Sequence, residues 1–168
     1  MRNVYAAFMA LAVALPLAAL ARQPAHSDVW NGAEIDWRDA RSGIYESAHS
    51  GKPVIMVFHA TWCTFCKKYR KVFFDKDVVA AAKDFVMILV DADADKTVNG
   101  AFAPDGSYVP RTIFLDSNGN IQSDLKAKGD PKYPHSVDID GPGELLGLMR
   151  RAHDKLAPAA PPASEDRT

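Results

Sequence analysis

The sequence predicts an α/β fold in which helices flank a central mixed β-sheet. Two continuous apolar runs, "PVIMVFH" at 53–59 and "FVMILV" at 85–90, are too short for typical helices and suit strands buried on both faces of a sheet. Segments with apolar residues at helical spacing alternate with these runs. At 168 residues, of which 48% are hydrophobic, the chain is long enough for one compact domain.

Residues 1–21 have the pattern of a secretory signal peptide. Arg2 precedes an uncharged apolar run, and the small-residue pattern Ala19-Leu20-Ala21 predicts cleavage after Ala21. A membrane anchor is the alternative interpretation. An apolar run of about 17 residues with Pro16 near its end is short, however, for a span of roughly 20 residues.

The charge balance of the remaining chain excludes one large class of partners. Removal of residues 1–21 leaves 19 basic residues against 21 acidic ones, a net charge of −2, which argues against binding to nucleic acid. No later apolar run is long enough to cross a bilayer, so no membrane span is expected after cleavage. Secretion would place the thiols where disulfides persist and exchange.

The first half of the expected domain contains helices on either side of one strand. A polar lead over residues 22–32 precedes a helix from about Asp36 to Ser50, which Gly51 and Pro53 close. After the strand at 53–59, a helix begins at about Trp62 and carries several basic residues. The segment "KDVVAAAKD" either continues that helix or forms a second short one.

The second half is expected to contain a strand, a hairpin and a final helix. The strand runs from Phe85 to about Asp91, and "RTIFLDSNGNIQSDL" predicts two antiparallel strands joined by a turn at Asn118-Gly119. Residues 142–156 place four leucines and a methionine on one broad helical face. The segment 157–168 reads as a disordered tail, so the domain is expected over residues 33–156.

Both cysteines of the chain, Cys63 and Cys66, lie within "HATWCTFCKKYR" directly after the first apolar strand. As a structural staple, their four-residue ring would remove only about 2 kcal/mol of unfolded-chain entropy. A zinc site needs roughly four ligands, and the five histidines show no paired spacing that would complete one. The spacing therefore favours a redox couple, and no metal or cofactor is expected.

The place of the cysteines predicts different roles for them. A cysteine at the N-terminus of a helix meets unpaired backbone N–H groups and the positive end of the helix dipole, which stabilise its thiolate. Cys63 is therefore the expected nucleophile. Cys66 lies one turn later, where it can attack a mixed disulfide formed at Cys63 but is expected to be deeper and less accessible.

The order of strand, "WCTFC", basic helix, second apolar strand and "YVPRTIFLD" resembles the thioredoxin superfamily over about residues 33–156. Within it, "KPVIMVFHATWCTFCKKYRKVFF" looks like the C-terminal domain of the bacterial reductant conductor DsbD. "FAPDGSYVPRTIFLDSNGNI" and "GDPKYPHSV" are more similar to the small endoplasmic-reticulum thioredoxin-domain oxidoreductase and the anterior gradient group. The resemblance implies the thioredoxin fold.

The resemblance also implies roles for five residues. Cys63 becomes the attacking cysteine, Cys66 the resolving cysteine, and Trp62 an apolar surface beside them. Pro110 matches the cis-proline of the family, which faces the CxxC motif and leaves the backbone of Val109 free to pair with a substrate strand. A trans proline at the start of an edge strand is the alternative for Pro110.

The chain departs from the family at the residue that handles protons. Thioredoxins carry an acidic residue six positions before the first cysteine, where this chain has Val57. His59 is near in sequence and could titrate near neutrality, although a packed or surface imidazole is the preferred interpretation. Asp91 and Asp93 could also approach Cys66, but "DADAD" reads first as a solvated loop.

The expected function is a secreted thiol-disulfide oxidoreductase, a monomer that exchanges disulfides with protein substrates and with a redox partner protein. A bacterial periplasm fits better than a retained lumenal location, because "SEDRT" is no KDEL-type signal. The alternative is a client-binding module, since the anterior gradient relatives bind clients with a degenerate motif. The sequence leaves the direction of electron flow open, because neither Thr64 nor Phe65 between the cysteines decides the redox potential.

Overall fold

The computed structural model describes residues 24–157, so the expected signal peptide and most of the expected tail lie outside the described part. Eleven elements follow one another along residues 24–157. They are η1 (Ser27–Trp30), β1 (Trp37–Arg38), α1 (Ala40–Ser50), β2 (Val54–His59), α2 (Thr64–Tyr69), η2 (Arg70–Phe74), α3 (Lys76–Ala82), β3 (Val86–Asp91), α4 (Lys96–Ala101), β4 (Arg111–Leu115) and α5 (Gly143–Leu156).

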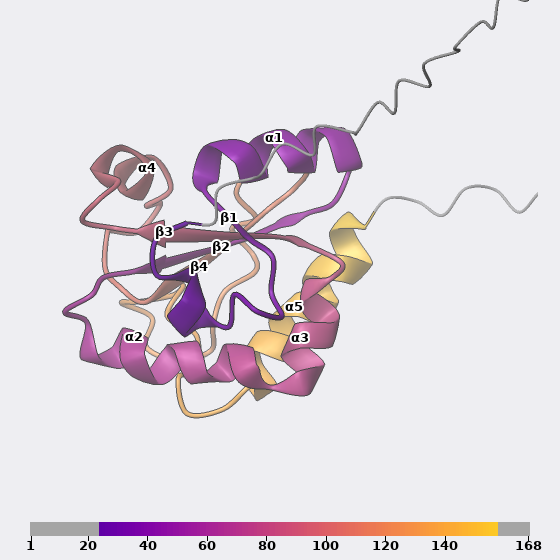
Figure 1. Cartoon of the computed structure of the whole chain (residues 1–168). Helices are drawn as coiled ribbons and strands as arrows, with labels where there is room; N and C mark the ends of the chain where they lie inside the picture. Colours follow the sequence, from indigo (N-terminus) through magenta and orange to yellow (C-terminus); the bar gives the residue numbers. More distant parts are fainter. Residues whose placement is uncertain (1–23, 158–168) are drawn as a thin grey trace, which may run out of the picture.

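The four strands form one mixed sheet in the order β1-β3-β2-β4. β1 and β2 both pair with β3 in parallel, and β4 runs antiparallel to β2. Helices α1 and α4 lie on one side of the sheet, and α2, α3 and α5 lie on the other (Figure 1). The predicted α/β class and mixed sheet are confirmed.

Alternate residues of each central strand supply two separate apolar cores, as the two-residue side-chain period of a strand requires. On the α1 and α4 side, Val54, Met56 and Phe58 of β2 pack with neighbouring strand residues and with the partly buried Ile44 and Val98. On the other side, Ile55 and Val57 pack with α2, α3 and α5. Because both faces are covered, the strands read as continuous apolar runs.

The first helix begins later than the sequence predicts. Trp37 and Arg38 pair with β3, so α1 begins at Ala40 and Asp39 is its N-cap, accepting a hydrogen bond from the Ser42 N–H at 2.9 Å. The predicted end is confirmed, because Gly51 closes the helix with a φ of 73°. The expected polar lead also contains a short helix, η1, and Trp30 within it is buried in the core.

The predicted hairpin is wrong in its second strand. After β4 only an isolated bridge joins Leu115 and Ile121, although the predicted turn is present and Gly119 has a φ of 83°. The outer edge of β4 is covered by loop instead, because the Thr112 N–H donates to the His135 carbonyl at 2.9 Å. Helix α4, which follows the aspartate-rich loop, was not predicted from the sequence. The final helix forms as predicted.

Candidate active site

Cys63 and Cys66 are joined by a disulfide at the point where the chain leaves β2 and enters α2. Their Cα atoms lie 5.2 Å apart. Cys63 is the N-cap of α2, and its Sγ accepts a hydrogen bond from the Cys66 N–H at 3.0 Å. The same sulfur that would carry the negative charge after reduction is therefore already aligned with a backbone donor.

The loop before β4 lies directly against Cys63. The Val109-Pro110 peptide bond is cis, as the resemblance implies for Pro110. The Val109 carbonyl oxygen lies 3.6 Å from the Cys63 Sγ, a close approach rather than a hydrogen bond because a disulfide sulfur carries no proton. Sequence positions 46 residues apart thus meet at the disulfide, as the fold prediction requires.

Exposed aromatic side chains surround this contact. Trp62 and Phe65 have exposed fractions of 66% and 59%, so the apolar rim expected beside the cysteines is present. A groove of about 510 Å³ is lined by Phe65, Val109, Pro110 and Tyr133, among other residues. An open apolar surface beside a buried disulfide suits contact with another polypeptide.

The side chain of Trp62 is held by Asp93, a role that was not predicted from the sequence. Its Nε1 donates a hydrogen bond to Asp93 Oδ2 at 2.7 Å, across 31 positions of sequence. Asp91 instead caps the loop after β3, where its Oδ1 accepts from the N–H groups of Asp93 and Ala94. Neither carboxylate contacts Cys66 by any hydrogen bond or ion pair among residues 24–157.

The two cysteines do not differ in exposure as expected. Their exposed fractions are 3% for Cys63 and 2% for Cys66, and both belong to the same apolar core. They differ in surroundings instead. Cys63 faces the Val109 loop, whereas Cys66 lines a separate cavity of about 230 Å³ whose wall also includes His59.

The imidazole of His59 is packed inside the fold. It is 3% exposed, and the rings of Trp30 and His26 lie at centroid distances of 5.3 and 5.8 Å. Its Nε2 is buried and has no hydrogen-bond partner in the described part of the chain. Burial lowers the pKa of His59 from 6.5 to about 4, although the Asp91 carboxylate acts in the opposite direction.

The free energy of unfolding should therefore fall as the pH falls from about 6.5 to about 4. In this window the unfolded chain binds a proton at His59 and the folded chain does not, so acidification favours unfolding. The whole pKa difference corresponds to a loss of at most about 3 kcal/mol. Urea unfolding at a series of pH values measures this slope.

The His59→Gln variant should lose this part of the pH dependence. The exposed His49 on α1 provides the matched control, since His49→Gln removes a histidine without removing a buried one. Identical slopes in wild type and His59→Gln would show that the imidazole is not held neutral by burial.

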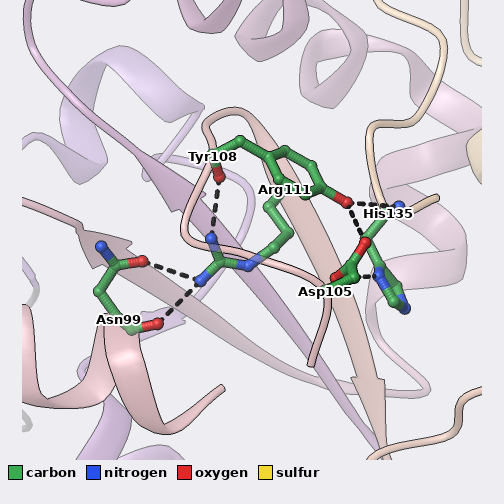
Figure 2. A network of polar contacts seen from close by, with 5 residues as sticks. All are labelled: Asn99, Asp105, Tyr108, Arg111 and His135. Carbon is green, nitrogen blue, oxygen red and sulfur yellow. Dashed lines mark hydrogen bonds and ion pairs between the residues drawn. The ribbon is translucent and has the colours of Figure 1, made fainter. Parts of the chain in front are cut away.

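A polar network fixes the loop that carries Val109 and Pro110 (Figure 2). Arg111, which is fully buried, donates from Nη1 to the Tyr108 carbonyl at 2.9 Å and from Nη2 to the Asn99 Oδ1 at 2.8 Å and carbonyl at 3.1 Å. Its guanidinium carbon lies 4.0 Å from the centroid of the Phe58 ring. The loop is thereby tied to both α4 and β2.

The second half of the network joins the loop before β4 to the segment around His135, which follows the turn at Asn118-Gly119. Asp105 accepts a hydrogen bond from the Tyr108 hydroxyl at 2.6 Å and pairs with His135 Nδ1 at 3.0 Å. The His135 N–H donates to the same tyrosine hydroxyl at 2.9 Å (Figure 2). A positioning role for these five residues was not predicted from the sequence, because their partners become neighbours only in the fold.

Comparison with known proteins agrees with this geometry. A family model described as thioredoxin-like matches residues 36–117. Anterior gradient protein 1 of Xenopus tropicalis is 33% identical over 129 residues, which cover 74% of this chain and 66% of that protein. The homologous protein of Xenopus laevis is 32% identical over 129 residues, which cover 74% of this chain and 68% of that protein.

This chain belongs to the thioredoxin-like family. It spans about two thirds of the length of the anterior gradient relatives. Among solved structures, a thioredoxin from Thermus thermophilus shares the fold with a TM-score of 0.55 and 18% identity, over 73% of this chain and 89% of that one. A disulfide-bonded CxxC in a thioredoxin-like chain supports thiol-disulfide oxidoreductase activity as the general class of function.

The described residues contain neither a membrane-spanning helix nor a cluster of metal ligands. Within residues 24–157, no helix is both long and apolar enough to span a bilayer. In the same part of the chain, no group of three or more metal-ligating side chains comes together.

Proposed function

We propose that this chain exchanges disulfides with protein substrates, with Cys63 as the attacking thiol and Cys66 as the resolving thiol. The observation that carries the proposal is the disulfide between them, placed beside an open aromatic groove and against the Val109 loop. In the reduced protein, the Cys63 thiolate attacks a substrate disulfide and forms a mixed disulfide, which Cys66 then resolves. The reverse sequence oxidises a substrate dithiol.

A substrate strand has a place to pair beside Cys63. Within residues 24–157, neither the N–H nor the carbonyl of Val109 pairs with another backbone group. An extended substrate segment can therefore add its backbone to this loop while its side chains enter the groove between Phe65 and Tyr133. The substrates this arrangement favours are extended or unfolded polypeptides with apolar residues near a cysteine.

The setting we propose for this activity is the periplasm of a bacterium, after removal of residues 1–21 and with a separate protein as redox partner. The apolar run and the small-residue pattern at the N-terminus support this assignment. A thioredoxin-like domain over residues 33–156, acting as a monomer, would carry the exchange.

Reduction of insulin disulfides tests the proposal. Wild-type protein should accelerate the reduction of insulin by a dithiol, and the Cys63→Ser variant should give only the uncatalysed rate. Thr64→Ser is a matched control, since it alters an exposed hydroxyl residue inside the motif and leaves both sulfurs in place. Equal rates for wild type and Cys63→Ser would rule out exchange through this motif.

The second candidate function is client binding without turnover, which the exposed Trp62, Phe65 and groove favour. The same variants separate the two functions. A binding module would retain its affinity for an unfolded polypeptide in Cys63→Ser and would show no insulin reduction in the wild type. Insulin reduction by the wild type, together with its loss in Cys63→Ser, would support the oxidoreductase function.

A further inference from the structure

The cavity beside Cys66 brings together the resolving sulfur and a buried histidine that the exchange described above leaves without a role. Cys66 and His59 both line this space of about 230 Å³, together with Trp30, Lys67 and Arg70. The volume is sufficient for several water molecules, and its wall carries polar groups that could hold them.

The fold explains why His59 reaches this place. Val57 and His59 are two positions apart on β2, so their side chains leave the same face of the sheet. That face packs against α2, and Val57 shares its core with Cys66. His59 is the next side chain after Val57 on that face in the direction of the cysteines.

Resolution of a mixed disulfide requires that Cys66 lose its proton. The thiolate is the attacking form of a cysteine, but Cys66 is only 2% exposed and burial favours the neutral thiol. A proton acceptor within reach of the buried sulfur would therefore speed this step. Of the titratable side chains lining the cavity, His59 is the one that is buried and has an unpartnered ring nitrogen.

We propose that His59 accepts the proton of Cys66 through the cavity that the two residues share. This inference rests on the proposed exchange function and assigns the proton acceptor for its second step.

The step balances in atoms and electrons. The Cys66 proton moves to a ring nitrogen of His59, directly or through water, and the Cys66 thiolate attacks the Cys63 Sγ. The Cys63–Cys66 bond forms as the bond from Cys63 to the substrate sulfur breaks. The electron pair of the broken bond leaves on the substrate sulfur, which takes up a proton from the imidazolium through water. The substrate disulfide is reduced by two electrons and the CxxC motif is oxidised.

The charges around His59 allow the imidazole to take up a proton transiently. In the disulfide form burial keeps the imidazole neutral, with a pKa of about 4. Proton transfer creates a thiolate beside the imidazolium, and this pair of opposite charges favours the transferred state. Asp91, the partner of His59 in the β2–β3 register, stabilises the imidazolium further, whereas His26 opposes it. Lys67 and Arg70 line the same cavity and favour the thiolate.

An aromatic disulfide that releases a coloured thiolate separates the two steps. Reduced protein mixed with dithiobis(nitrobenzoate) should release one nitrothiobenzoate as Cys63 forms the mixed disulfide. A second nitrothiobenzoate follows when Cys66 resolves it. The first phase depends on reagent concentration and the second does not, so stopped-flow absorbance measures each rate separately.

The His59→Gln variant should slow the second phase by about tenfold to a hundredfold at neutral pH and leave the first phase within about twofold. Its second phase should also rise in proportion to hydroxide concentration, because hydroxide then takes the proton, whereas the wild-type profile should be shallower. Free imidazole added to His59→Ala should restore the second phase only. A purely structural role for His59 would produce none of these selective effects.

Two further variants test the proposal independently of whether a His59 variant folds. Asp91→Asn retains the loop cap and removes the charge, so it should slow the second phase in the same direction even if a His59 variant fails to fold. His49→Gln on the distant surface of α1 should change neither phase. A second phase within about twofold of wild type in both His59→Gln and Asp91→Asn, or slowing in His26→Gln alone, overturns the proposal. Absence of both phases in the wild type would instead overturn the proposed function.

Discussion

Replacing Cys66 with alanine should leave Cys63 joined to substrate sulfurs in stable mixed disulfides, and insulin reduction should fall to the uncatalysed rate. The variant can still complete the first attack, because Cys63 and the Val109 loop are unchanged. It lacks the second sulfur, so no intramolecular attack can release the substrate. Non-reducing electrophoresis and mass spectrometry of the acid-quenched reaction with insulin measure the covalent adduct.

Two controls establish which cysteine forms the adduct and whether the Cys66→Ala variant remains folded. Cys63→Ala should give no adduct, because Cys66 is buried and does not line the groove. Thermal unfolding of reduced Cys66→Ala should stay close to that of the reduced wild type, since the side chain loses only one sulfur atom. Adducts that form through Cys66 in the Cys63→Ala variant, and none through Cys63 in Cys66→Ala, would reverse the two roles.

The central strands, the final helix and the redox motif could be predicted from the sequence because their signals are local. Strands buried on both faces read as unbroken apolar runs, as β2 and β3 do. The final helix places its buried residues at helical spacing along α5. A W-C-x-x-C motif after such a strand, with an X-Pro before a later strand, needs no knowledge of tertiary contacts.

The elements that were missed depend on contacts made between distant segments. β1 is only two residues long and exists because Trp37 and Arg38 pair with β3. The second strand of the hairpin is absent because a later loop, through the His135 carbonyl, takes one of the hydrogen bonds at the outer edge of β4. In α4 no residue is fully buried, so the sequence has no strong helical periodicity there.

The features of the site also divide into those with a local sequence signal and those that depend on contacts between distant segments. Cys63, Cys66, Trp62, Val109 and Pro110 could be singled out from motif and resemblance, and the structure brings them together. The hydrogen bond from Trp62 to Asp93 and the cavity shared by Cys66 and His59 could not, because each joins segments whose proximity only the folded sheet creates.

Replacing Arg111 with methionine should lower the free energy of unfolding by about 2–4 kcal/mol. Burial lowers the pKa of this guanidinium, which shows that its charge is held at a cost, and no ion pair of Arg111 is found within residues 24–157. Methionine removes that cost but leaves three half-buried acceptors, the Asn99 Oδ1 and the Asn99 and Tyr108 carbonyls, without these donors. The loss of three hydrogen bonds outweighs the relief of one desolvated charge, because a hydrogen bond from a charged donor contributes about 1.5–3 kcal/mol.

Urea unfolding of Arg111→Met measures this loss, and Arg151→Met is the matched control. Arg151 is exposed on α5 with one long hydrogen bond of 3.5 Å, so its replacement should change stability by no more than about 0.5 kcal/mol. The network also holds the Val109 loop, so insulin reduction by Arg111→Met should decrease even at a temperature where the variant is folded. Unchanged stability together with wild-type turnover would show that packing around Phe58 alone positions the loop beside Cys63.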